Sequence, residues 1–291
     1  MKMNEIVYRG YTVQQLDDQY NARAAVPDCE KIFETWRARS ADYRQRSFCQ
    51  LDVSYGFSEN ETLDLFMPGR TNAPVMVFIH GGYWRSMDKS DFSYLAEGLV
   101  NKGCLVAVVN YGLCPAVTID EIVEQMRSAC QWLWRTCSEY GGDPRRIHVS
   151  GHSAGGHLTA MLMATDWSSL ALDLPLDLIK SGTAVSGLFE LKPMLYLPLN
   201  DDLKLDEESA HRNSPVFLEP ETDAPLSIVA GGEESEEFRR QSLDFTKKWR
   251  GRGVRIEYIE LAGLNHFTIL DRMEDPSAPF TKILLHHMGL D

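Results

Sequence analysis

The sequence predicts an α/β fold, in which a mostly parallel central sheet is covered by helices on both faces. Short, continuously apolar runs at 74–80, 104–109 and 226–230 are typical of strands that are buried on both sides. Segments with helical periodicity separate these runs, and strands that alternate with helices form parallel sheets. The 291 residues, 44% of them hydrophobic, suffice for one large domain of this kind.

The first segment of the chain is expected to be helical. Residues 11–44 read as two polar helices that separate near Pro27, because proline interrupts a helix. Three apolar residues form a patch at helical spacing on the second helix: Ile32, Phe33 and Trp36. We therefore predict that residues 1–46 form a helical extension packed on a main domain of residues 47–291.

The main domain is predicted to start with an antiparallel hairpin at the sheet edge, since 48–55 and 62–67 alternate between apolar and polar residues. The helix at 118–140 has the clearest pattern, with apolar residues three and four apart and Gly141–Gly142 after it. The other elements alternate along the chain: helices at 90–102, 156–162, 235–250 and 279–289, and strands at 74–80, 104–109, 146–150, 179–185, 226–230 and 254–259.

One segment, residues 187–222, interrupts this alternation. Its apolar residues lie among prolines and acids without a clear strand pattern. An insertion of this length in an α/β domain is more typical of a small cap or lid than of a pair of structural strands.

The composition excludes several classes of function. The net charge of −13 would repel nucleic acid and anionic membranes, so we expect neither as a partner. The six cysteines form no C-x-x-C motif, and no metal ion or cofactor is predicted. The absence of a signal-like apolar core and of a long apolar run predicts a cytoplasmic protein. The motifs described below predict a small-molecule substrate as its partner. The sequence leaves the oligomeric state open, a homodimer included.

The most informative motif is Gly-His-Ser-Ala-Gly at 151–155, which lies between a predicted strand and a predicted helix. A serine at such a turn adopts a strained backbone conformation, and small neighbours let the strand and the helix approach each other. This arrangement is a nucleophile elbow, so Ser153 is the candidate nucleophile.

A serine hydroxyl needs a base that is itself oriented by a carboxylate. In α/β sheets these groups lie in loops after the carboxyl ends of late strands. His266 follows the last predicted strand and is the candidate base. The loop after the strand at 226–230 holds four glutamates and no aspartate, and two of the four begin the next helix. Glu234 is therefore favoured as the acid, with Glu233 as the alternative.

The chemistry also needs N–H donors for an oxyanion. His-Gly-Gly-Tyr-Trp at 80–84 follows an apolar strand and matches the donor loop that accompanies a nucleophile elbow. Gly82, Tyr83 and Ala154 are the candidate donors, and the histidine that opens the motif is expected to brace the loop. The Tyr83 and Trp84 side chains fit a pocket wall or the core equally well.

Four stretches together resemble kynurenine formamidase-like α/β-hydrolases, which are similar to hormone-sensitive-lipase-like esterases: His80–Trp84, Gly151–Leu158, Glu234–Ser242 and Asn265–Phe267. The resemblance extends from about residue 48 to the C-terminus. It implies an α/β-hydrolase fold with Ser153 as nucleophile and His266 as base. The acid of that family, usually aspartate, falls on Glu234, which is one methylene longer.

The motifs and the resemblance predict a serine hydrolase that works through an acyl-enzyme, with an aryl formamide such as N-formylkynurenine as substrate. A carboxylesterase or arylamidase for small acyl esters, amides or carbamates would use the same triad, and a non-catalytic binding protein of the same fold is the third alternative. Five aromatic residues are candidates to contact the substrate ring: Tyr83, Trp84, Phe189, Tyr196 and Phe267.

Overall fold

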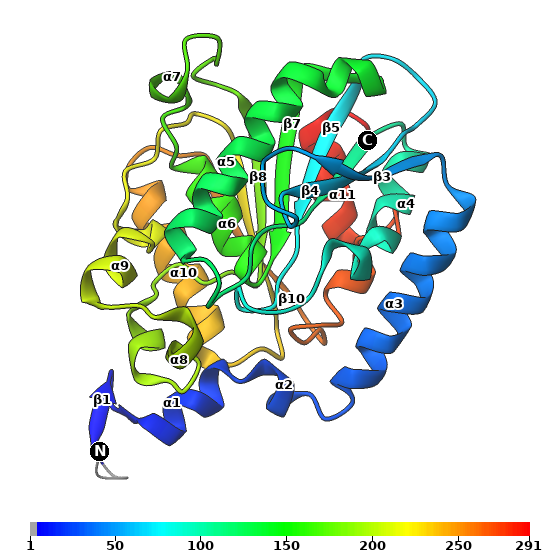
Figure 1. The fold of residues 1–291 in the computed structure, drawn as a ribbon. Helices are drawn as coiled ribbons and strands as arrows, with labels where there is room; N and C mark the ends of the chain where they lie inside the picture. Colours follow the sequence, from blue (N-terminus) through cyan, green and yellow to red (C-terminus); the bar gives the residue numbers. More distant parts are fainter. Residues whose placement is uncertain (1–4) are drawn as a thin grey trace.

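The computed structural model describes residues 5–291 and centres on an eight-stranded sheet with the strand order β10-β9-β8-β7-β5-β6-β4-β3 (Figure 1). The first six strands in this order are parallel, and β4 and β3 are antiparallel at one edge. The strands are β3 (Cys49–Ser54), β4 (Thr62–Phe66), β5 (Ala73–Ile79), β6 (Leu105–Val109), β7 (Gly142–His152), β8 (Ile179–Val185), β9 (Leu226–Gly231) and β10 (Ile256–Leu261), besides a short pair of β1 (Ile6–Tyr8) and β2 (Tyr11–Thr12). The prediction of a mostly parallel sheet is confirmed.

Helices cover both faces of the sheet, as predicted. In Figure 1, α5, α6 and α10 lie on one face, and α3, α4 and α11 lie on the other. Each set packs into its own apolar cluster against the sheet. The helices are α1 (Val13–Tyr20), α2 (Ala22–Ala25), α3 (Cys29–Arg46), α4 (Ala96–Asn101), α5 (Ile119–Thr136), α6 (Ala154–Met163), α7 (Trp167–Leu170), α8 (Asn200–Leu203), α9 (Glu207–Arg212), α10 (Glu236–Arg250) and α11 (Pro279–Met288).

The hairpin at the sheet edge is present, but only β3 is exposed there. Strand β4 pairs with β3 on one edge and with β6 on the other. Its faces are buried despite the alternating sequence, because Leu63 and Leu65 pack into one apolar cluster and Phe66 into the other. The polar residue Asp64 is accommodated in β4 because the Lys89 ammonium lies 2.9 Å from its carboxylate. A buried carboxylate is tolerated when an opposite charge and hydrogen bonds replace its water.

The predicted helix at 90–102 is shorter in the structure. Two 3-10 turns, Lys89–Asp91 and Ser93–Leu95, precede α4. The rings of Phe92 and Tyr94 pack on Trp36 of α3, with centroid separations of 5.6 and 6.3 Å. This packing brings two aromatic residues to one side of a tighter turn, which overrides the helical periodicity.

The N-terminal segment packs on the main body at two places. Helix α3 is anchored by Phe33 and Trp36, which are almost fully buried. Helix α1 is anchored by Tyr20, whose hydroxyl donates to Glu237 of α10 over 2.9 Å and accepts from Gln241 over 2.7 Å. Helix α1 lies beside α8 in Figure 1, and the segment that holds α2 connects the two anchors.

Among residues 5–291, no helix is long and apolar enough to cross a bilayer.

A buried histidine in the sheet makes the fold sensitive to acid. His148 in β7 lies 2.8 Å from the Ser181 hydroxyl, and burial, aided by His287, Arg146 and Lys180, lowers the pKa of its ring to about 3. The unfolded chain titrates near the usual 6.5, so below that pH it binds more protons than the folded state. Stability from this group is complete above about pH 6.5 and is lost as the pH falls towards 3.

We expect the free energy of unfolding to fall by about 2 kcal/mol between pH 7 and pH 5 through His148 alone. Urea unfolding at the two pH values measures the change. The His148→Asn variant keeps a polar atom near the Ser181 hydroxyl but does not titrate, so its stability should depend less on pH by that amount. An unchanged pH dependence in the variant would contradict the assignment.

Candidate active site

Ser153 lies at a sharp turn between the end of β7 and the start of α6. Its backbone has φ 56° and ψ −116°, which is a strained conformation for a residue with a side chain. A Cβ on Gly155 would lie 2.0 Å from the Ile79 carbonyl oxygen, and one on Gly151 would lie 2.3 Å from the Gly155 carbonyl oxygen. The two glycines are therefore required for β5, β7 and α6 to approach each other closely.

His266 and Glu234 meet in the loops after β10 and β9. The His266 Nδ1 atom lies 3.0 Å from Glu234 Oε2, and the carboxylate is fully buried. The other oxygen of Glu234, Oε1, accepts hydrogen bonds from the Ser186 hydroxyl and from the Gly231 amide, both at 2.6 Å. Glu233, the alternative acid, is exposed. The structure thus brings Glu234 to His266.

Two neighbours of this pair have no signal in the sequence that marks them. Ser186 follows β8 with φ 51° and holds the Glu234 carboxylate. His152, the second residue of the elbow motif, has its Nε2 atom 2.6 Å from the His266 carbonyl oxygen. Burial lowers the pKa of His152 well below its usual value, so its neutral ring can donate this bond and tie the elbow to the loop of His266.

The loop at 80–84 has the backbone needed for an anion-binding turn. Gly82 has φ 109°, and a Cβ there would lie 2.1 Å from the Ser86 carbonyl oxygen, so only glycine fits. Tyr83 follows with φ 51°. Among residues 5–291, neither amide donates a hydrogen bond, and Ala154 occupies the first position of α6, where helix amides have no intrahelical partner.

His80 braces this loop, as expected from the sequence. Its Nε2 atom lies 3.0 Å from the Asn110 side-chain oxygen, and its ring stacks on Tyr111 at a centroid separation of 4.3 Å. The Tyr111 hydroxyl in turn donates to the His80 carbonyl oxygen over 2.9 Å. Burial lowers the pKa of His80, which keeps this ring neutral and structural.

Ser153 and His266 line one cavity of about 590 Å³. Among the described residues, no hydrogen bond joins the Ser153 hydroxyl to the imidazole. In hydrolases without substrate such bonds are often long and tighten when substrate binds. Three other predicted site residues line the same cavity: Gly82, Tyr83 and Phe267.

Three of the five predicted substrate contacts do not line this cavity, and the prediction is corrected for them. Trp84 is fully buried with its ring edge-on to His157 at 4.9 Å. Phe189 is fully buried and stacks on Phe245 at 4.4 Å. Tyr196, in the insertion, is half-buried against the same core. Trp84 and Phe189 are therefore core residues, and Tyr196 packs against the core. Sequence alone did not separate them from cavity residues, because it does not give the direction of a side chain.

The cavity wall contains residues that the sequence did not indicate. Two buried aromatic rings from α3, Phe33 and Trp36, were expected only to dock on the main body, and both face the cavity. The other unexpected wall residues come from the N-terminal segment, the residues after the donor loop, the elbow motif and the insertion: Asp17, Tyr20, Asn21, Ala22, Arg23, Arg85, Ser86, Met87, His152, Leu197, Pro198, Leu199 and Asp202. Within residues 5–291 no group of three or more side chains is arranged to hold a metal ion.

The chain is similar to known proteins over most of its length. A model of the BD-FAE family matches residues 63–249, which is most of the sheet and its helices. The kynurenine formamidase of Danio rerio is 33% identical over 260 residues, covering 86% of each chain. The kynurenine formamidase of Salmo salar is 32% identical over 281 residues, covering 93% of each chain.

A solved structure has the same fold over nearly its full length. It comes from Silicibacter sp. TM1040 and carries a provisional thioesterase assignment. The TM-score is 0.83 at 30% sequence identity, with 92% of this chain and 98% of that chain covered.

Proposed function

Since the chain belongs to the kynurenine formamidase family of α/β-hydrolases, we propose that it is a serine hydrolase that removes a formyl group from an aryl formamide. The observation that carries the proposal is the buried pair of Glu234 and His266, whose imidazole lines the same cavity as Ser153. That combination supplies a nucleophile, a base and an orienting acid, the three parts that acyl transfer to serine requires.

The proposed reaction has two steps. The Ser153 oxygen attacks the formyl carbon while His266 Nε2 takes the hydroxyl proton, and the amides of Gly82, Tyr83 and Ala154 stabilise the oxyanion. The C–N bond then breaks, and His266 gives its proton to the departing arylamine. Water attacks the formyl-enzyme with His266 again as base, the proton returns to the Ser153 oxygen, and formate leaves.

The glutamate in place of the usual aspartate fits this role. Its Oε1 atom accepts from the Gly231 amide three residues earlier, so the carboxylate folds back on its own turn. This bent side-chain conformation accommodates the added methylene, and Oε2 remains available to bind His266. A carboxylate in this position holds the imidazole in one tautomer and stabilises the imidazolium that forms.

The cavity also suits an aromatic leaving group. Phe33, Trp36 and Phe267 are almost fully buried and line it together with His266. Aromatic rings pack well edge-on and offset on one another, as Phe33 and Phe267 do here at 5.0 Å. An arylamine that leaves from the carbonyl carbon would have such a wall beside it.

Steady-state rates with N-formylkynurenine and with p-nitrophenyl acetate test the proposal. We expect kcat/KM to be higher for the formamide by at least about tenfold, with formate and kynurenine as products. Ester hydrolysis without formamide turnover would overturn the proposed substrate and leave a carboxylesterase, the second candidate, which would use the same nucleophile, base and acid. The cytoplasmic location, the cap role of 187–222 and the homodimer stay predictions.

A further inference from the structure

The mouth of the cavity carries four charged side chains of balanced sign. Asp17 comes from α1, Arg23 from α2, Arg85 from the segment after the donor loop, and Asp202 from α8. The buried end is aromatic, whereas the side chains of Arg85 and Asp202 are 41% exposed and that of Arg23 is 55% exposed. A ligand that fills the cavity from Ser153 outward therefore meets rings first and opposite charges second.

Two of these charges act on the side chain of Tyr83, a residue of the donor loop. Burial raises the pKa of the Tyr83 hydroxyl above its usual range, the charge of Asp17 raises it further, and the charge of Arg85 lowers it. Tyr83 lies next to Gly82 in the donor loop and faces the cavity. Asp17 and Arg85 thus both act on the Tyr83 side chain, which forms part of the same cavity wall.

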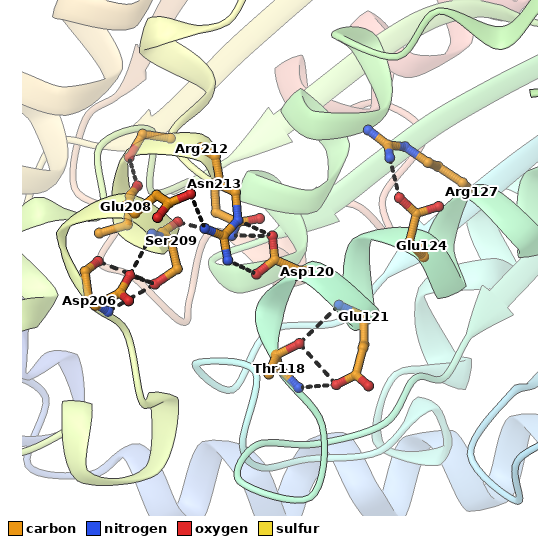
Figure 2. Close-up of polar contacts among 12 residues, drawn as sticks. Thr118, Asp120, Glu121, Glu124, Arg127, Asp206, Glu208, Ser209, Arg212 and Asn213 are labelled. Atoms are coloured by element: carbon orange, nitrogen blue, oxygen red, sulfur yellow. Dashed lines mark hydrogen bonds and ion pairs between the residues drawn. The ribbon is translucent and has the colours of Figure 1, made fainter. Parts of the chain in front are cut away.

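Arg85 and Asp202 form an ion pair of 2.5 Å across the mouth, between the donor loop and the insertion. Such an exposed pair contributes little to stability, typically below about 1 kcal/mol. The insertion is held on its other side by a stronger contact, because the Arg212 guanidinium donates two hydrogen bonds to Asp120 of α5, at 2.7 and 2.9 Å (Figure 2). Asn213 donates a third to the same carboxylate over 3.0 Å. The fold therefore does not depend on the pair at the mouth.

We infer that Arg85 and Asp202, with Asp17, form a subsite for the charged tail of an aryl substrate that carries both a carboxylate and an ammonium group, an α-amino acid. Arg85 takes the carboxylate, since a guanidinium binds carboxylates through two parallel hydrogen bonds. Asp202 and Asp17 take the ammonium group. The inference rests on the proposed function, because it places the ring of the same substrate beside Ser153.

This subsite explains how the enzyme would distinguish its substrate from a simple ester. A neutral aryl ester reaches Ser153 but leaves the Arg85–Asp202 pair as it is. A substrate with a zwitterionic tail replaces each partner of the pair by a charge of the same sign, so neither Arg85 nor Asp202 is left without an opposite charge. The subsite thus recognises the tail by exchanging the ion pair between Arg85 and Asp202 for two ion pairs with the substrate. The bound tail also shields the mouth of the cavity from water.

Inhibition constants test the subsite independently of formamide turnover. Kynurenine and 2-aminoacetophenone share the aryl ring and the carbonyl group, but only kynurenine carries the amino acid tail. Each is used as an inhibitor of p-nitrophenyl acetate hydrolysis by the full chain. We expect kynurenine to bind the unmodified enzyme at least about tenfold more tightly, and Arg85→Gln and Asp202→Asn each to reduce this ratio about tenfold. The ratio cancels any change in ester hydrolysis itself.

Arg135→Gln is the matched control, because Arg135 forms an equally exposed ion pair with Asp173 that does not line the cavity. It should leave the ratio of inhibition constants unchanged. A ratio that stays within twofold of the unmodified value in both Arg85→Gln and Asp202→Asn would overturn the subsite. Failure of the proposed function is a different result, namely no release of formate from N-formylkynurenine by the unmodified enzyme.

Discussion

Replacement of Ser153 by alanine is expected to lower kcat by at least about 10⁴-fold for any acyl substrate, because no oxygen remains to form the acyl-enzyme. The substitution removes one oxygen at a residue whose φ stays at 56°, so it adds no backbone strain. Hydrolysis in the unmodified and substituted chains is compared at saturating substrate, and labelling by a fluorophosphonate reports the nucleophile directly.

Ser150→Ala is the control for this experiment. Ser150 lies in the same strand, is fully buried, and donates to the Thr183 carbonyl oxygen over 3.0 Å. Its loss should lower stability by about 1 kcal/mol and leave the labelling intact. Labelling of the Ser153→Ala chain at the unmodified rate would show that another residue is the nucleophile.

Glu234→Gln is expected to have the next largest effect, a fall in kcat of about 10³- to 10⁴-fold with little change in KM. An amide at this position no longer fixes the tautomer of His266 or stabilises the imidazolium in the transition state. The Ser186 hydroxyl and the Gly231 amide still bind the side-chain oxygen, so the loop keeps its structure. Steady-state kinetics with ester and formamide measure the loss.

Glu233→Gln is the matched control, one residue away and exposed. It removes the same charge from the same loop without touching His266, so kcat should stay within about twofold. Equal losses in the two variants would indicate that the charge of the loop, and not the contact with His266, is what matters.

The sequence predicts those parts of the fold and site whose structure is determined by neighbouring residues in the chain. The apolar run at 74–80 and the glycines around Ser153 reflect covered strands and a tight turn, and both are found at the predicted places. Glu234 and His266 follow successive strands of a parallel sheet, and that topology brings their loops together.

The parts that were missed depend on contacts between distant segments. Trp84 has φ 57° in the turn after Tyr83, and its ring packs against α6 instead of the cavity. Phe33 and Trp36 have helical spacing, which predicts that they are buried but not what they face. Ser186 and His152 act through single hydrogen bonds to residues 48 and 114 positions away, which no local pattern encodes.

The anchors of Tyr20 have a consequence for how the protein is made. The Tyr83 hydroxyl donates to the Tyr20 carbonyl oxygen over 2.6 Å, and Tyr20 is bound by Glu237 and Gln241, 217 and 221 positions later. During synthesis on the ribosome, the wall formed by the first helices has to wait for α10 before it can close. Loop closure over such separations is slow. Competence for turnover should thus arise only after α10 has been synthesised, because the wall that Tyr20 and Tyr83 share depends on it.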